Sequence, residues 1–139
     1  WLAAHDSVDA ERIGIFGISL GGITAALTAE HEPRFRNVCL MLAGGDLAKV
    51  TWESKELRRV REKWEAGGGT VDEFYGRRLL MLNARNDEVI PPACTESLWR
   101  AVGEPRIVWY DAGHYSAAGY LLHGLVEVSK FFADESPAE

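Results

Sequence analysis

Apolar runs alternate with amphipathic segments along most of the chain, a pattern that predicts strands separated by helices. Buried strands alternating with helices are typical of an α/β fold in which a parallel sheet lies between two helical layers. The sequence therefore predicts a three-layer parallel sheet of about four strands, flanked by helices. The expected strands are continuously apolar, as strands covered on both faces are: Arg12–Gly17, Asn37–Ala43, Arg78–Asn83 and Arg106–Tyr110.

Three helices are expected between and after these strands. One runs from Ile23 to His31, and a second begins after Pro91-Pro92 and ends near Gly103. In the last helix, apolar residues recur at spacings of 4, 3 and 4, which predicts a single buried face formed by Leu121, Leu125, Val128 and Phe132.

The segment between the second and third strands breaks the alternation. Glu53–Glu65 holds five basic and four acidic residues, with Leu57, Val60 and Trp64 at helical spacing. This pattern predicts a solvated amphipathic helix with a narrow apolar stripe. The alternative is that residues 47–76 form a cap-like helical insertion over a site, with the glycines at 67–69 as its hinge. A nucleic-acid role is disfavoured because the acidic residues nearly cancel the basic ones.

Composition narrows the class further. The chain has 139 residues, 47% of them hydrophobic, and a net charge of −6. We expect one domain over residues 1–139, and a net negative chain is a poor partner for nucleic acid or an anionic membrane. The first residues lack the basic start and apolar centre of a secretion signal, so we expect a cytoplasmic protein. Cys39 and Cys94 are predicted to be reduced core residues, and no metal or cofactor motif is present.

The motif with the clearest chemistry is Gly17-Ile18-Ser19-Leu20-Gly21-Gly22, placed where a strand ends and a helix begins. A serine at such a junction lies on a tight, strained turn, and glycines two residues away on either side allow the close approach of the backbones. The following helix N-terminus favours negative charge, and the Leu20 backbone N–H is a candidate oxyanion donor. The alternative is a glycine-rich turn without chemistry.

A nucleophilic serine needs a base, and the base needs an acid to orient it. Two of the later strands are followed by such residues, Asp87 after the third and His114 after the fourth. The carboxyl ends of parallel strands lie at one edge of a sheet, where open α/β folds place their sites. We therefore expect Ser19, Asp87 and His114 to meet there.

Other residues compete for these roles. Asp46, after the second strand, is the alternative acid, and Glu88 is expected to point away from the site. Three histidines are near helix ends or within the last helix and are expected to be structural or solvated: His5, His31 and His123.

With these motifs in the order Ser19, Asp87, His114, the sequence resembles the α/β-hydrolase family. The Gly21-Gly22 pair resembles the sequences of the esterase, dienelactone-hydrolase-like and prolyl-peptidase-like branches of that family. The resemblance implies that Ser19 is the nucleophile, His114 the general base and then acid, and Asp87 the residue that holds the imidazole. It also implies a truncated fold, lacking the usual N-terminal strands and the loop that donates the second oxyanion N–H.

In a truncated fold of this kind the strand Arg12–Gly17 would be an edge with unpaired backbone, so we expect a homo-oligomer formed through it. The expected reaction is hydrolysis of a small, short-chain carboxylic ester through an acyl-enzyme, without a cofactor or metal. Peptidase or thioesterase activity through the same residues, and a fragment or scaffold without independent activity, remain the alternatives. Three aromatic residues are candidates for lining an acyl pocket, although core packing is also expected for the tryptophans: Trp52, Trp64 and Tyr115.

Overall fold

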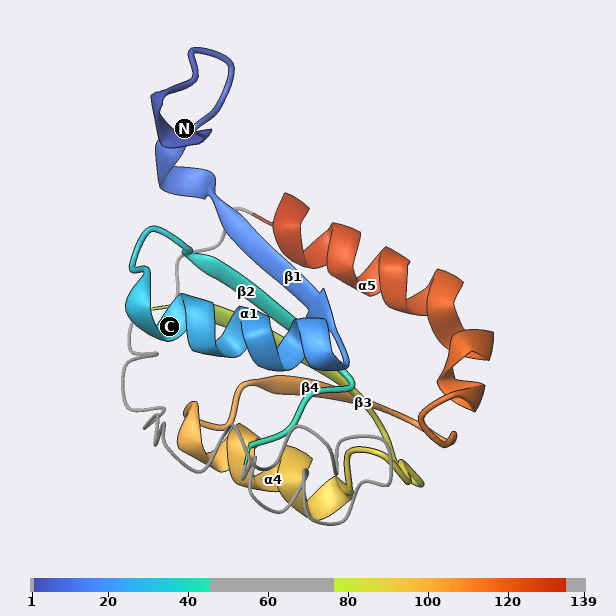
Figure 1. Ribbon diagram of the computed structural model, residues 1–139. Coiled ribbons are helices and arrows are strands. Elements are labelled where there is room, and N and C mark those ends of the chain that lie inside the picture. The colour runs from blue at the N-terminus through green and yellow to red at the C-terminus, as the bar shows by residue number, and fades with distance from the viewer. Residues whose placement is uncertain (1, 46–76, 135–139) are drawn as a thin grey trace.

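A computed structural model describes residues 2–45 and 77–134 (Figure 1). Within them, four parallel strands form one sheet in the order β1-β2-β3-β4, and the predicted α/β class is confirmed. The strand bounds differ from the predicted ones by at most two residues at either end: β1 (Gly14–Ile18), β2 (Asn37–Met41), β3 (Arg78–Ala84) and β4 (Arg106–Tyr110).

Helices cover both faces of this sheet, as Figure 1 shows. The helices α1 (Leu20–His31) and α4 (Pro92–Ala101) lie on one face and α5 (Leu121–Ala133) on the other. Short 3-10 turns precede β1 and α5: η1 (Leu2–Ala4), η2 (Ala10–Arg12) and η4 (Ser116–Tyr120). The three predicted layers are therefore present.

Alternate residues of the central strands build the two halves of the core. Val38 and Leu40 of β2 pack with the alanines of α1 and with Leu98 of α4. Cys39 and Met41, on the opposite face of the same strand, pack with α5. Because successive side chains of a strand point to opposite faces, a continuously apolar strand is needed to serve both layers.

Helix α1 begins earlier than the pattern predicted, at Leu20 rather than Ile23. Its first turn contains Gly22, where an added Cβ would lie 2.9 Å from the Cβ of Ala43 and 3.0 Å from the carbonyl oxygen of Met41. Glycine weakens helices in general, which is why the pattern suggested a later start. Here the tight approach of the helix to β2 outweighs that preference.

The buried face of α5 matches the predicted one only in its second half, where Val128 is buried and Phe132 packs against the core. Leu121 and Leu125 are each 42% exposed, whereas Val128 is 8% and Phe131 9% exposed. The helix approaches the sheet at Gly124, where an added Cβ would lie 3.3 Å from the Met41 Cε. This contact rotates the helix so that one row of apolar side chains, here called the α5 stripe, faces outward: Leu121, Leu122, Leu125 and Val126.

The predicted insertion over residues 47–76, with its candidate stripe and hinge, lies outside the described residues. The cysteine prediction is confirmed, since Cys39 and Cys94 are buried and reduced, and burial raises the pKa of Cys39 to about 12. Among the residues that the structure describes, no helix is both long and apolar enough to cross a membrane.

Candidate active site

Ser19 occupies a strained turn between β1 and α1. Its backbone has φ 55° and ψ −120°, a left-handed conformation that a residue with a side chain rarely adopts. The Ser19 N–H donates to the carbonyl oxygen of Met41 at 2.8 Å, so the end of β2 holds the turn. The Ser19 side chain is partly exposed, which leaves its hydroxyl accessible beyond the end of the strand.

The two glycines that flank the serine differ in what they permit. A Cβ on Gly17 would overlap the carbonyl of Gly21, so the chain can cross itself closely only with glycine at 17. At Gly21, by contrast, an added Cβ would meet nothing within 4 Å, and Gly22 is the second crowded position. The prediction that Gly21 allows the close approach is therefore wrong, and Gly22 has that role because the helix turns its third residue toward β2.

The other two predicted site residues lie beside the serine. The Ser19 Oγ is 2.9 Å from the Nε2 of His114, and the Nδ1 of His114 is 2.8 and 3.0 Å from the two carboxylate oxygens of Asp87. His114 is 9% and Asp87 5% exposed. The structure thus brings all three predicted residues into one connected chain of hydrogen bonds.

The partners decide which nitrogen of His114 carries the proton. An ionised carboxylate is only an acceptor, so the Nδ1 donates to Asp87 and leaves the Nε2 of a neutral ring with its lone pair toward the Ser19 hydroxyl. Asp87 is itself held in place, because its Oδ1 accepts from the N–H groups of Val89 at 2.9 Å and Ile90 at 2.7 Å. The arrangement can remove the proton of a serine hydroxyl as the oxygen attacks an electrophile.

Main-chain hydrogen bonds beyond the strand ends place the acid beside the base. The Arg85 N–H donates to the Tyr110 carbonyl at 2.9 Å, and the Asn86 N–H donates to the Ala112 carbonyl at 3.0 Å. These bonds continue the β3–β4 ladder past the ends of both strands. Because β3 and β4 are neighbours in the sheet, the loops that carry Asp87 and His114 leave the sheet side by side.

The competing residues are placed elsewhere. The alternative acid Asp46 lies outside the described residues. His5 and His31 are exposed, and the Nδ1 of His123 on α5 is 3.1 Å from the Tyr110 hydroxyl. Glu88 does not point away from the site as predicted, because its Oε2 accepts from the backbone N–H of His114 at 2.9 Å. Residue spacing alone could not reveal this contact, because Glu88 and His114 come together only when the loops after β3 and β4 pack side by side.

Two residues border the serine and the histidine. Leu20 is the first residue of α1, where helices leave their N–H groups without an intrahelical partner, and its side chain is 53% exposed. The ring of Tyr115 is 64% exposed and lies edge-on to the His114 imidazole, with 5.4 Å between the centroids. Of the three candidates for an acyl pocket, only Tyr115 is among the described residues.

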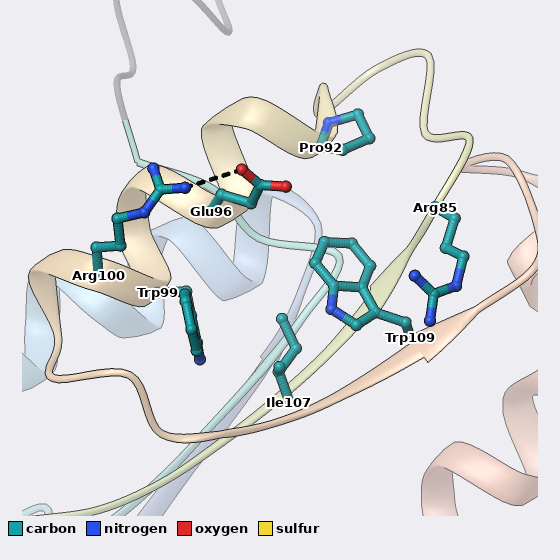
Figure 2. Close-up of a pocket in the computed structure, with 7 residues that line it drawn as sticks. All are labelled: Arg85, Pro92, Glu96, Trp99, Arg100, Ile107 and Trp109. Carbon is teal, nitrogen blue, oxygen red and sulfur yellow. Dashed lines mark hydrogen bonds and ion pairs between the residues drawn. The ribbon is translucent and has the colours of Figure 1, made fainter.

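A separate cavity of about 400 Å³ lies between α4 and β4, and Figure 2 shows the residues that line it. Its wall contains Trp99 and Trp109, with the Arg85 guanidinium 5.7 Å from the centroid of the Trp109 ring. Ser19, Asp87 and His114 do not line this cavity, so it is not the space in which Ser19 would meet a substrate. In the described part of the chain, no group of three or more histidine, cysteine or acidic residues could hold a metal ion.

Solved structures with the same fold are numerous. Acetyl xylan esterase 1 from Thermoanaerobacterium sp. has a TM-score of 0.74 at 19% identity, and the match covers 97% of this chain and 49% of that chain. A putative dipeptidyl aminopeptidase IV from Bacteroides ovatus has a TM-score of 0.71 at 20% identity, covering 91% of this chain and 20% of that one. The enol-lactonase from Burkholderia xenovorans has a TM-score of 0.65 at 16% identity, covering 90% and 67%.

These neighbours establish the fold, and this chain spans about half the length of the acetyl xylan esterase. A comparison with curated proteins gave no significant match. The family model of the X-Pro dipeptidyl-peptidases (S15 family), however, matches residues 1–119, a stretch that includes β1 to β4 and the loops bearing Ser19, Asp87 and His114. By this match the chain belongs to the X-Pro dipeptidyl-peptidase (S15) family, within the α/β-hydrolase clan.

Proposed function

We propose that this chain is a serine hydrolase that cleaves carboxylic esters of small, short-chain acyl groups. The observation that carries the proposal is the hydrogen-bonded series Ser19–His114–Asp87, with 2.9 Å from Oγ to Nε2 and 2.8 Å from Nδ1 to the nearer carboxylate oxygen. A strained serine, an aligned base and a buried acid are the components of acyl transfer. Membership of a hydrolase clan agrees with this chemistry.

The proposed reaction has two halves. In the first, the Ser19 Oγ attacks the ester carbonyl while the His114 Nε2 takes its proton, and the alcohol leaves with that proton. In the second, His114 removes a proton from water, whose oxygen attacks the acyl-enzyme, and the imidazolium returns that proton to the Ser19 Oγ as the acid leaves. Asp87 holds the ring and stabilises the imidazolium that forms in each half.

Charge on the substrate oxygen also needs stabilisation in both halves. We assign one donor to the Leu20 backbone N–H at the positive end of α1. The exposed ring of Tyr115, next to the imidazole, is the proposed contact for the acyl group. No metal or organic cofactor takes part in the proposed scheme.

A second candidate function is hydrolysis of an amide bond after proline. The family match favours it, and a putative dipeptidyl aminopeptidase is among the proteins that share the fold. The same residues serve both reactions, because His114 can protonate an amine as well as an alcohol leaving group. Rates with p-nitrophenyl acetate and with Ala-Pro-p-nitroanilide, measured side by side, separate the two.

The test of the serine itself is labelling with a fluorophosphonate probe. We expect the wild-type chain to be labelled and Ser19→Ala to lose the label. Ser97→Ala, which removes an exposed hydroxyl from α4, is the matched control and should be labelled like the wild type. Equal or absent labelling in wild type and Ser19→Ala would contradict the proposal and favour a scaffold role.

We also propose that copies of the chain associate through β1. Within the described residues β1 pairs with β2 on one side only, and its last residue, Ile18, is 40% exposed. An unpaired strand edge is a template for another strand, and a two-fold axis lets one edge serve both copies. The proposed partners are therefore a small ester and a second copy of the chain.

A further inference from the structure

Two consecutive acidic residues reach the same histidine from one loop. Asp87 contacts the His114 ring at Nδ1, at 2.8 Å, and Glu88 accepts from the His114 backbone N–H at 2.9 Å. The first contact orients the ring and the second holds the main chain from which the ring extends. His114 is thus fixed at two points by neighbouring carboxylates.

The residue before the histidine is fitted to the second carboxylate. An added Cβ at Gly113 would lie 2.5 Å from the Glu88 Oε2 and 3.3 Å from the Asn86 carbonyl oxygen. The carboxylate therefore packs directly against the Cα of Gly113, a position that any side chain there would obstruct. The steric fit and the hydrogen bond involve the same Glu88 oxygen, so Gly113 leaves the space that this oxygen occupies when it binds the His114 N–H.

The contact of Glu88 with the His114 main chain affects the distance between the His114 Nε2 and the Ser19 Oγ, on which the proposed reaction depends. The Nε2 of His114 is 2.9 Å from the Ser19 Oγ, and a hydrogen bond to the nucleophile weakens steeply when its geometry is lost. A displacement of about 1 Å can cost about 10²-fold in rate. An ionised acceptor also makes a stronger hydrogen bond to an N–H than a neutral one does.

We propose that Glu88 is a positioning residue, which clamps the main chain of His114 so that its ring stays aligned with Ser19. This inference rests on the proposed hydrolase function. Glu88 touches neither Ser19 nor the ring in the contacts above, so it acts through His114. Its loss should lower kcat and leave KM for the ester unchanged.

The first test compares Glu88→Ala with Glu88→Gln in the full chain. We expect the rate of fluorophosphonate labelling and kcat for p-nitrophenyl acetate to fall about 10- to 100-fold in Glu88→Ala. Glu88→Gln keeps an oxygen acceptor and should stay within about threefold of the wild type, since a neutral acceptor makes a weaker but intact bond. A Glu88→Ala rate within twofold of the wild type overturns the proposal.

Two controls separate positioning from general effects. Glu96→Ala removes another exposed carboxylate, and Asp111→Ala breaks the 3.0 Å bond from the Asn86 amide that joins the same two loops. Both should keep the wild-type rate. An equal loss in Asp111→Ala would assign the effect to loop attachment in general and overturn the role of Glu88.

Gly113→Ala supplies an independent variant, because its methyl group would displace the Glu88 carboxylate. We expect it to reproduce the loss seen in Glu88→Ala. The double variant Gly113→Ala/Glu88→Ala should lose no more than either single one, since both remove the same contact. Losses that multiply in the double variant contradict the clamp.

Hydrogen exchange of the His114 amide, followed by NMR, distinguishes failure of this inference from failure of the proposed function. The exchange should be faster in Glu88→Ala and close to the wild-type rate in Glu88→Gln. If the wild type takes no label, the hydrolase proposal fails whatever the exchange shows. If exchange is unchanged in Glu88→Ala, the clamp is absent even in a chain that is labelled.

Discussion

At the scale of single residues, two kinds of close contact build the candidate site. One is steric, at Gly17, where the crossing of β1 and α1 leaves no room for a Cβ. The other is polar, at Asp87, whose oxygens accept from the His114 ring and from two backbone N–H groups. Each makes a prediction that a single substitution tests.

Gly17→Ala should destabilise the protein by about 1–3 kcal/mol, because its methyl group would overlap the Gly21 carbonyl and force the turn apart. Gly21→Ala is the matched control. Its methyl group meets nothing within 4 Å, and alanine suits a helix better than glycine by up to about 1 kcal/mol. Urea unfolding measures both, and a stable Gly17→Ala would contradict the crowded turn.

Asp87→Asn should lower kcat for the ester about 10³- to 10⁴-fold, while the melting temperature changes little. The amide keeps one oxygen for the N–H groups of Val89 and Ile90 but favours the wrong tautomer of His114. Steady-state kinetics measure the loss. Asp111→Asn, at an exposed position on the neighbouring loop, should retain the wild-type rate, and a comparable loss there would contradict a specific role for Asp87.

At the scale of elements, the attachment of α5 to the sheet depends on charge as well as on apolar packing. Arg106, the first residue of β4, forms an ion pair with Glu127 of α5, and Lys130 of the same helix pairs with Glu127 at 3.4 Å. The hydrogen bond from Arg106 is the main cause that lowers the pKa of Glu127 from its ordinary value of 4.5. The side chain of Glu127 is 8% exposed.

A lowered pKa in the folded state means that the ionised carboxylate stabilises the fold. This stabilisation is complete above pH 4.5 and is lost as the pH falls through the lower, folded-state pKa. Glu127→Gln should therefore reduce the free energy of unfolding at pH 7, and the difference from the wild type should narrow in acid. Urea unfolding at pH 7 and pH 3 measures it.

The control for this prediction is Glu96→Gln, since both side chains of the Glu96–Arg100 ion pair on α4 are exposed to solvent. Exposed pairs of this kind contribute little, about 0–1 kcal/mol. A difference for Glu127→Gln that stays constant with pH would show that packing, rather than charge, holds α5 to the sheet.

At the scale of the whole molecule, the described residues include an unpaired strand edge and a row of exposed apolar side chains on α5. Within the described residues one edge of β1 is unpaired, and β1 contacts the helix that carries the α5 stripe, since Gly14 packs against Phe132. Leu122 is 80% exposed, the largest value among the large apolar residues that the structure describes. Exposed apolar side chains and an unpaired strand edge each favour association.

We expect sedimentation velocity to detect concentration-dependent self-association of the chain. Leu122→Glu, which places a charge in the α5 stripe, should weaken it, because a buried charge is costly. Leu2→Glu, at an exposed leucine of η1, should not. A wild-type chain that remains monomeric at every concentration would contradict the proposed association.

The sequence alone predicted the fold class, because continuously apolar strands that alternate with helices along a chain can bury their side chains in few folds other than a parallel sheet between helical layers. It also singled out Ser19, Asp87 and His114, since each follows a strand and the ends of parallel strands meet at one edge. These inferences depend on local pattern and chain order, which a sequence contains.

Other features depended on contacts between residues distant in the chain. The approach of Gly124 to Met41 decided which face of α5 is buried, so helical spacing misassigned Leu121 and Leu125. The crowding at Gly22 and the contact of Glu88 with His114 likewise arise where separate segments meet. Periodicity reports what a segment prefers by itself, whereas the distances that align a site are decided only when the segments pack together.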